Sequence, residues 1–324
     1  GAIHEKPPHF AACHGSPKEP RLVRVTRIPF TRKGDAVCPI PIASGCEGSC
    51  SYCITKIARG SLKSRPVEEI LAEANRSLER GAVELQLCAQ DSGVYGSDIG
   101  SSLPELVNAV SALDGDFMVR IGMMNPGSVN DAFSELLDAY DNPKVFKFMH
   151  LPVQSGDGAI LASMGRRYTA GAALDLIESF RKRFPESTIS TDVIVGYPGE
   201  DSKAHGATRR FIELARPDMV NVTRFSPRPG TTAAGMAGTP HGRTVKARSR
   251  ELAALWMAIA AEKNSQLRGK RFGVLSVETG KGSTTMARTS GYKLIIIPKC
   301  VDLGRRYVVT IDRTNSINLF GKLG

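Results

Sequence analysis

Three cysteines, Cys46, Cys50 and Cys53, stand close together in the pattern C-x3-C-x2-C. Thiolates are the usual protein ligands of iron–sulfur clusters. Three of them can hold three irons of a [4Fe-4S] cube and leave the fourth iron open to an exogenous ligand. Gly45 and Gly48 let the loop wrap a bulky group without clashes from Cβ atoms. The residue types and their spacing therefore predict a [4Fe-4S] site with one open position.

A structural zinc site is the alternative for the same three cysteines, and it needs a fourth ligand. Cys38 lies at the far end of the strand-like run before the triad, and no histidine lies near the triad in the sequence. Zinc sites typically use two C-x2-C pairs, whereas this chain has a single triplet. The pattern favours a cluster over zinc. The remaining cysteines, Cys13, Cys38, Cys88 and Cys300, are scattered, and we expect them to be small buried residues.

The triad follows the first of six apolar runs that are typical of strands. These runs cover residues 37–43, 83–88, 117–121, 145–151, 188–195 and 219–225. Helical patterns lie between them at 66–81, 103–113, 130–140, 170–184 and 203–215. The alternation predicts parallel strands with crossover helices, and we favour a partial (β/α)6 TIM-like barrel over an open doubly wound sheet. Chemistry in such a fold collects at the C-terminal ends of strands, where the triad falls.

The last part of the chain changes character after a long helix predicted over 243–266. Short β-rich runs at 272–277, 293–298 and 306–311 are separated by glycine-containing turns, which predicts a small antiparallel barrel. We therefore expect a linker or arm over residues 1–36, an α/β domain over 37–267 that holds the triad, and an all-β domain over 268–324.

The net charge of +11 is concentrated at the two ends of the chain. Residues 1–37 hold seven Lys or Arg against three Asp or Glu, and residues 268–324 hold eleven against three. The region between them is nearly neutral, with 25 against 26. Basic ends on a neutral body predict that the ends bind a polyanion. The alternative is a solvated basic surface that has no partner.

Composition also limits the cellular setting. No apolar run approaches the roughly 20 residues that cross a bilayer, and the first residues lack the apolar centre of a signal peptide. Seven cysteines, three of them clustered, do not suggest a secreted disulfide framework. We therefore expect a cytoplasmic protein that has no membrane association.

The triad and the blocks after it resemble the radical SAM superfamily, and within it the methylthiotransferases. The blocks are GCEGSCSYCITKIARG, LCAQDSGVYGSDIG, RIGMMNP, HLPVQSGDGAILASMGRRYT, TDVIVGYPGE and FSPRPGTTAA. ITKIARG and QDSGVYGSDIG look most like the archaeal and eukaryotic branch. That branch adds a methylthio group to N6-threonylcarbamoyladenosine beside the anticodon of tRNA. The basic C-terminal segment resembles the family's TRAM domain, a small OB-like barrel that binds tRNA.

The resemblance implies that Cys46, Cys50 and Cys53 hold the cluster and that its open iron takes the amino and carboxylate groups of S-adenosylmethionine (SAM). It assigns no catalytic residue beyond these ligands. It implies that the SAM or substrate pocket is lined by Gln90, Asp91, Gln154, Ser155, Arg166 and Asp192. The turn over residues 196–200 would flank the adenosine part of SAM. Each of these residues also has an ordinary interpretation as a helix cap, an exposed helix-end charge or a turn.

The implied reaction begins when one electron from the reduced cluster breaks a C–S bond in SAM. The resulting 5′-deoxyadenosyl radical abstracts the hydrogen at C2 of the adenine, and a methylthio group replaces that hydrogen. A loop nucleotide is the sensible target because a base inside an RNA helix is unreachable.

The sequence departs from the family in one respect. Family members carry an N-terminal domain with three more cysteines, which hold a second [4Fe-4S] cluster associated with sulfur delivery. Only Cys13 and Cys38 precede the triad here. We therefore expect this chain to cleave SAM, and to bind the tRNA anticodon stem-loop through residues 268–324, without inserting sulfur.

Two other functions remain open at this point. One is the family branch that modifies an aspartate of a ribosomal protein. The other is a non-catalytic zinc protein that binds RNA through its basic barrel. The sequence does not indicate the electron donor or the sulfur source.

Overall fold

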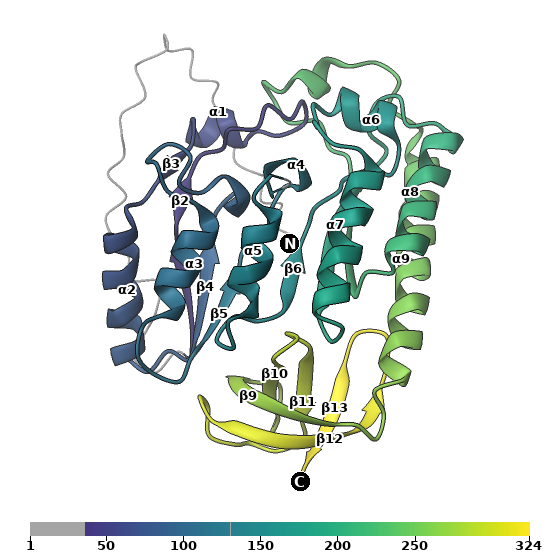
Figure 1. Cartoon of the computed structure of the whole chain (residues 1–324). Coiled ribbons are helices and arrows are strands. Elements are labelled where there is room, and N and C mark those ends of the chain that lie inside the picture. Colours follow the sequence, from purple (N-terminus) through teal and green to yellow (C-terminus); the bar gives the residue numbers. More distant parts are fainter. Residues whose placement is uncertain (1–35, 130) are drawn as a thin grey trace, which may run out of the picture. The chain divides into compact units, whose positions relative to one another are not determined.

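Six parallel strands form the first part of the computed structural model, which describes residues 36–129 and 131–324 (Figure 1). The strands are β1 (Val37–Pro41), β4 (Glu84–Cys88), β5 (Met118–Ile121), β6 (Phe148–His150), β7 (Thr188–Val195) and β8 (Met219–Arg224). β1, β4 and β5 form one sheet, and β6, β7 and β8 form another. A parallel bridge between Val119 and Val145 connects the two sheets. This arrangement confirms the predicted partial barrel.

The crossover helices pack on the outside of these strands (Figure 1). They are α2 (Val67–Glu79), α3 (Leu103–Ser111), α5 (Phe133–Asp141), α7 (Ala170–Arg183) and α8 (Ser202–Ala215), and α9 (Gly242–Ser265) follows β8. Their starts follow local sequence signals. Ser102 and Glu105, for example, form a reciprocal capping box at α3. One apolar core lies between strands and helices and includes the fully buried Ile40, Leu87 and Leu106.

Several short elements were not predicted from the sequence. They are α1 (Thr55–Arg59), α4 (Pro126–Val129), α6 (Gly158–Ser163), the strand pair β2 (Ala43–Ser44) and β3 (Lys63–Ser64), and the 3-10 turns η1 (Ser92–Val94) and η2 (Thr232–Gly235). Each is too short to display a hydrophobic period. All of them lie in the connections that leave the C-terminal ends of the parallel strands or in the segments that cover those ends, and they surround the cysteine loop.

The C-terminal segment is a closed five-stranded barrel. Its strands are β9 (Arg271–Thr279), β10 (Thr285–Thr289), β11 (Leu294–Ile297), β12 (Arg306–Thr314) and β13 (Leu319–Leu323), in the order β10-β11-β13-β12-β9. The expectation of a small OB-like barrel is confirmed. One detail differs, because β11 and β13 pair in parallel and the barrel is therefore not entirely antiparallel. β10 and β13 are short strands that the sequence patterns did not indicate.

The small barrel packs against the N-terminal ends of the parallel strands. The Tyr292 hydroxyl donates to Oε1 of Glu84, the first residue of β4, at 3.0 Å. The Lys147 N–H, just before β6, donates to the Ser290 carbonyl at 2.8 Å. An apolar cluster combines side chains of both parts, among them Phe146, Phe148 and Leu275. The barrel therefore lies at the opposite ends of the strands from the cysteine loop, which follows β1.

A buried carboxylate, Asp218, also joins the two parts. It forms ion pairs with Lys263 of α9 at 2.7 Å and with Lys293 of the barrel at 2.8 Å, and it accepts the Ile189 N–H. Burial opposes ionisation of this carboxyl, but the two ammonium groups and the N–H outweigh burial and hold the pKa of Asp218 below its usual value. The ionised form of Asp218 therefore stabilises the folded state.

We predict an acid-sensitive contribution from Asp218. Because the pKa of Asp218 is lower in the folded state, its contribution to stability is complete at pH values above its pKa in the unfolded chain, about 4. This contribution is lost as the pH falls from about 4 through the lowered pKa of the folded state. In urea unfolding at a series of pH values, the wild type will lose stability more steeply below pH ~4 than Asp218→Asn will. Equal slopes for the two proteins in that window would contradict the prediction.

Residues 1–35 lie outside the described residues, and with them Cys13 and all but the last residue of the arm predicted over 1–36. The domain boundaries proposed above stay predictions. In the two described stretches, we find no helix that combines the length and the apolar character required to cross a membrane.

Candidate functional site

The cysteine loop is held by backbone contacts to three separate segments. The Cys46 N–H donates to the Gly60 carbonyl at 3.3 Å, beyond α1. The Ser51 N–H donates to the Met164 carbonyl at 3.0 Å, directly after α6, and the Ser51 carbonyl accepts the Ala233 N–H at 2.8 Å. Because these anchors are main-chain groups, the loop is positioned independently of what its thiols bind.

All three thiols of the triad line one cavity of about 320 Å³ at the C-terminal ends of the strands. Gly48 lies between two of them: a Cβ atom there would be 3.3 Å from the Cys46 sulfur and 3.7 Å from the Cys50 sulfur. Burial raises the pKa of both thiols above the ordinary value. Three thiols that face one cavity, with the space at Gly48 left open, fit a group that takes several thiolate ligands.

No three His, Cys, Asp or Glu side chains in residues 36–129 and 131–324 are grouped closely enough to hold a single metal ion. Cys38, the candidate fourth zinc ligand, is buried 3.1 Å from the Ser77 hydroxyl of α2 and does not line the cavity. Cys88 is half-buried within the barrel, and Cys300 is exposed. The expectation that the scattered cysteines are buried is therefore met at Cys38 but not at Cys300.

Five of the six predicted pocket residues line the cavity that the thiols face: Gln90, Asp91, Gln154, Arg166 and Asp192. They come from four different loops and strands. The structure does not bring the sixth, Ser155, to this cavity. The Ser155 hydroxyl lies 3.3 Å from the Thr208 hydroxyl of α8 and accepts the Asp157 N–H.

Two polar atoms in the cavity wall are buried without a hydrogen-bond partner among the described residues: Oε1 of Gln90 and Nε of Arg166. Buried polar atoms are normally paired, so both atoms suit contact with a bound ligand. The Arg166 guanidinium also donates to the Tyr52 hydroxyl and lies 5.8 Å from the centre of its ring. Burial raises the pKa of Tyr52 to about 12, so this hydroxyl stays protonated. Because Tyr52 belongs to the cysteine loop, Arg166 places its positive charge on the side of the cavity where that loop lies.

Gln154 adopts an uncommon backbone conformation, with φ of 71°. Residues other than glycine rarely adopt a positive φ, and such strain is concentrated at functional sites. The backbone N–H of Gln154 donates to the Asp192 carbonyl at 2.7 Å, and its carbonyl accepts the Ile194 N–H at 2.9 Å. These bonds to β7 hold the strained residue at the cavity wall.

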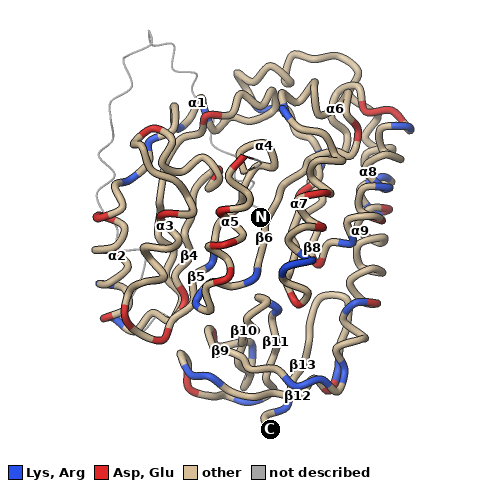
Figure 2. The backbone as a smooth tube through the Cα atoms, in the orientation of Figure 1, with Lys and Arg blue, Asp and Glu red and all other residues tan. Residues whose placement is uncertain are grey.

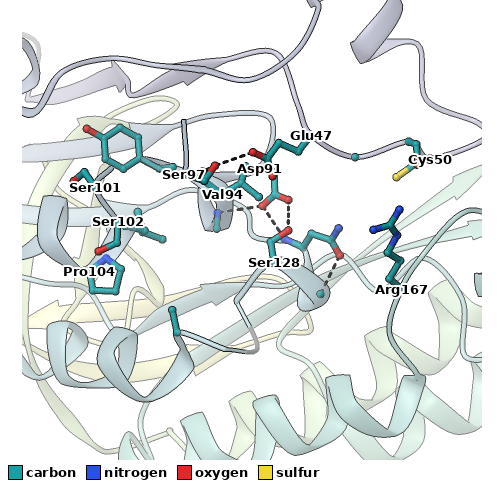
Figure 3. A pocket seen from close by; sticks show the side chains of 18 of the residues that line it. Glu47, Cys50, Asp91, Val94, Ser97, Ser101, Ser102, Pro104, Ser128 and Arg167 are labelled. Atoms are coloured by element: carbon teal, nitrogen blue, oxygen red, sulfur yellow. Dashed lines mark hydrogen bonds between the residues drawn. The ribbon is translucent and has the colours of Figure 1, made fainter. Parts of the chain in front are cut away.

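Both oxygens of the Asp91 carboxylate accept hydrogen bonds that join two loops (Figure 3). Its Oδ1 accepts the N–H groups of Gly93 and Asn125, and its Oδ2 accepts the Ser128 hydroxyl at 2.6 Å. Asp91 also lines a second cavity, of about 470 Å³, which Figure 3 shows beside Cys50. The structure therefore gives Asp91 a positioning role between the loops after β4 and β5.

Asp192, which the sequence analysis named, forms hydrogen bonds with two polar residues that it did not name, His150 and Asn221. Its Oδ2 lies 2.7 Å from Nε2 of His150, and its Oδ1 accepts the Asn221 amide at 2.6 Å. These residues lie on the neighbouring strands β6, β7 and β8. His150 falls at the end of a strand-like run, just as the Gln90–Asp91 pair does, and that position was the available signal. Asn221 had no such signal, since only the strand register places it opposite Asp192.

The turn over residues 196–200 does not line the cavity. The Gly196 N–H donates to Oε2 of Glu200 at 2.6 Å, and Oε1 of Glu200 pairs with Arg248 of α9 at 2.8 Å. A Cβ atom at Gly196 would lie 2.6 Å from the Val245 side chain. In this structure the turn fixes α9 against the end of β7.

We predict that Gly45→Ala will displace the cysteine loop. The φ of Gly45 is 74°, and a Cβ atom would lie 2.0 Å from the Ser61 carbonyl oxygen. Gly60 is the matched control, because its φ is 77° but a Cβ atom there meets nothing within 4 Å. Gly60→Ala carries only the backbone strain, about 1–3 kcal/mol. We expect Gly45→Ala to bind much less iron after reconstitution than Gly60→Ala, and equal iron contents would contradict the geometry.

The fold and the site together define a class: a partial β/α barrel with a three-cysteine loop after its first strand and a polar cavity beside that loop. The family model described as the radical SAM superfamily matches residues 40–212. This chain belongs to the radical SAM superfamily.

The chain is also similar to several curated proteins. A probable threonylcarbamoyladenosine tRNA methylthiotransferase of Pyrococcus horikoshii is 45% identical over 260 residues, which are 80% of this chain and 61% of that protein. One of Archaeoglobus fulgidus is 42% identical and covers 81% of this chain and 62% of that protein. The Drosophila melanogaster threonylcarbamoyladenosine tRNA methylthiotransferase is 34% identical and covers 91% and 54%. The chain thus spans between half and two thirds of the length of these relatives.

Among solved structures, coproporphyrinogen III oxidase of Escherichia coli, described as a radical SAM enzyme, matches with a TM-score of 0.52 at 12% identity, over 89% of this chain and 68% of that one. The radical S-adenosylmethionine methyltransferase TsrM of Kitasatospora setae, with cobalamin and a [4Fe-4S] cluster bound, matches with a TM-score of 0.51 at 14% identity, over 61% and 36%. Both support the fold of the strand–helix part.

Proposed function

We propose that this chain is the SAM-cleaving and RNA-binding part of a tRNA methylthiotransferase that acts on N6-threonylcarbamoyladenosine. The observation that carries the proposal is the single cavity that the three thiols share with Gln90, Gln154, Arg166 and Asp192. Identities of 34–45% to relatives named for this reaction support the choice of substrate. The small basic barrel, at the other ends of the strands, supports RNA as the partner.

In this proposal Cys46, Cys50 and Cys53 hold the [4Fe-4S] cluster, and SAM binds at the iron that has no cysteine. When bound, the cluster supplies the electron that cleaves SAM. Arg166 offers a fixed positive charge near the cysteine loop, which suits the carboxylate of SAM. The unpaired Oε1 of Gln90 can accept a hydrogen bond from an amino group. The chain's own residues thus bind and orient the reactants, while the cofactors carry out the chemistry.

The rest of the cavity fits a nucleoside. Pro152, Met123 and Ile194 provide an apolar wall, and Asp192 provides carboxylate oxygens in a group braced by His150 and Asn221. Apolar walls with a few placed polar groups are typical of small-molecule sites. The half-buried position of the thiols limits the access of water to a reactive intermediate.

The test is EPR spectroscopy of the anaerobically reconstituted and reduced protein, with and without SAM. We expect a [4Fe-4S] signal that changes when SAM is added, accompanied by release of 5′-deoxyadenosine. Stoichiometric zinc with no cluster signal would overturn the proposal in favour of a zinc protein that binds RNA.

The substrate requires a separate measurement. We expect the chain to bind tRNA that carries N6-threonylcarbamoyladenosine and not to bind a ribosomal protein. Binding of the ribosomal protein alone would instead assign the chain to the branch that modifies an aspartate. Formation of methylthiolated tRNA by this chain alone would contradict the expectation that it does not insert sulfur.

A further inference from the structure

The C-terminal barrel has two surfaces that could bind RNA: the face that OB-like barrels usually use, and a basic cluster elsewhere on the barrel. Because the barrel packs against the strand–helix part, these two surfaces differ in how much of each remains accessible. OB-like barrels usually bind nucleic acid with their second and third strands and with the loops after the first and fourth strands. Here those strands are β10 and β11, and the loops cover residues 280–284 and 315–318. We first consider how much of this usual face remains free.

Part of the usual face is covered. The turn between β10 and β11 carries Tyr292 and Lys293, which are bound to Glu84 and Asp218 of the strand–helix part. The carbonyl groups of Asn315 and Ser316, in the loop after β12, accept the amide of Asn264 from α9. The first loop, with Lys281, remains exposed, and Asn315 and Ile317 of the loop after β12 are also exposed.

The docking also occupies part of the positive charge of the barrel. Lys293 pairs with Asp218, Arg306 pairs with Asp116, and Arg288 lies 3.7 Å from Glu84. These three cations are directed at the strand–helix part. The positive charge of residues 268–324 is therefore not all available to a polyanion, although a count of Lys and Arg in the sequence includes every one of these residues.

The other surface is a cluster of basic residues at the end of the barrel where the chain enters it from α9. We call it the barrel patch, and it consists of Arg268, Lys270, Arg271, Arg313 and Lys322, all exposed. Asp312 is the acidic neighbour of this group, paired with Lys322 at 2.7 Å. Arg313 stacks on the Phe320 ring, with 4.1 Å from its guanidinium carbon to the ring centre. A cationic surface with a stacked aromatic ring is typical of sites for single-stranded or loop RNA.

α9 connects the barrel patch to the cavity end of the strands. Val245 near its start touches Gly196, just beyond the C-terminal end of β7, and Lys263 near its end binds Asp218 at the start of β8. Its 24 residues span about 36 Å at 1.5 Å per residue. Arg243, Lys246 and Arg250 are exposed on its first turns.

These three residues, the helix stripe, lie at positions i, i+3 and i+7, which share one helix face. No acidic side chain in residues 36–129 and 131–324 forms an ion pair with any of them. Figure 2 shows Lys and Arg along α8 and α9 and on the small barrel. Exposed cations near both ends of α9 provide phosphate contacts near the cavity and far from it.

We propose that tRNA is held by the helix stripe and the barrel patch, and not by the usual binding face of the OB-like barrel. This inference rests on the proposed function and adds the surface and the part of the RNA concerned. The barrel lies at the opposite ends of the strands from the cavity, and β7 alone spans roughly 26 Å. The nucleotide in the cavity and the RNA on the barrel patch are therefore different parts of one molecule. In this proposal the barrel binds the body of the tRNA and not the anticodon loop.

Two triple variants test this surface with equal changes of charge. The patch variant is Arg268→Gln, Arg271→Gln and Arg313→Gln. The loop variant is Lys281→Gln, Lys299→Gln and Arg305→Gln, three exposed cations in loops on the rest of the barrel. Equal thermal unfolding will confirm that both remain folded. The affinity for full-length tRNA is then measured over a series of KCl concentrations, next to the affinity for an isolated anticodon stem-loop.

We expect the patch variant to bind full-length tRNA about 10- to 100-fold more weakly and to reduce the slope of log affinity against log salt by about two to three. The loop variant will stay within about twofold of the wild type, and the stem-loop will be little affected by either. An equal or larger loss in the loop variant would overturn the proposed surface and leave the proposed function intact. Wild-type protein that binds no RNA at all would instead refute the proposed function.

Discussion

Cys50→Ala will bind no [4Fe-4S] cluster and will release no 5′-deoxyadenosine above background. Cys50 supplies one of three thiols that face a single cavity, and a cluster held by only two protein ligands is not retained stably. The fold will survive, because the cysteine loop is anchored by main-chain bonds of its neighbours and not by the thiol. Iron and sulfide analysis after anaerobic reconstitution, together with EPR of the reduced protein, will measure the loss.

Cys300→Ala is the matched control for this experiment. Cys300 is a free, exposed thiol on the small barrel, so its removal will leave iron content and SAM cleavage unchanged. Retention of a wild-type cluster by Cys50→Ala would show that the triad is not the ligand set. A loss in both variants would point to general thiol damage, and it would withdraw support from the assignment of Cys50.

Asp218→Ala will produce the largest loss of stability among the contacts between the two folded parts. Asp218 has 7% of its side chain exposed, and removing it leaves the ammonium groups of Lys263 and Lys293 partly buried without their carboxylate. Breaking a buried ion pair from one side costs about 3–5 kcal/mol. Chemical denaturation will measure the decrease in the free energy of unfolding, and the small barrel will become more susceptible to proteolysis.

Asp116→Ala is the surface counterpart of that variant. Asp116 also joins the two parts, through Arg306, but 71% of its side chain is exposed. Exposed ion pairs contribute about 0–1 kcal/mol, so this variant will differ little from the wild type. If Asp116→Ala were as destabilising as Asp218→Ala, burial would not be the property that makes the Asp218 contact strong.

Local patterns were sufficient to predict much of the fold. The six parallel strands lie within or next to the predicted apolar runs. β7, for example, covers the same residues as the run predicted over 188–195. The long helix predicted over 243–266 is α9, Gly242–Ser265. Such elements are predictable because burial of one face imposes a period that is visible within a few residues. The short α1, α4 and α6 have no room for a period, and they were missed.

The cavity was partly predictable for a related reason. Residues that closely follow parallel strands gather at one end of a barrel, which is why Gln90 and Gln154 meet the cysteine triad. Arg166 follows α6 instead, and only the packing of that segment brings it to the same cavity. The same rule cannot tell which of two adjacent residues faces inward. Gln154 lines the cavity and Ser155 faces α8, and that outcome depends on the backbone turn at Gln154.

The sequence by itself determined the spacing of the cysteine triad, the order of strands and helices, and the excess of positive charge at the C-terminal end. These properties reside in residue types and short spacings. Only the tertiary structure decided that Asp91 positions two loops, that His150 and Asn221 join Asp192, and that Lys293 and Arg306 hold the small barrel in place. Each of these outcomes depends on contacts between residues that are distant in the chain. Such contacts are set by register and packing, which no local pattern encodes.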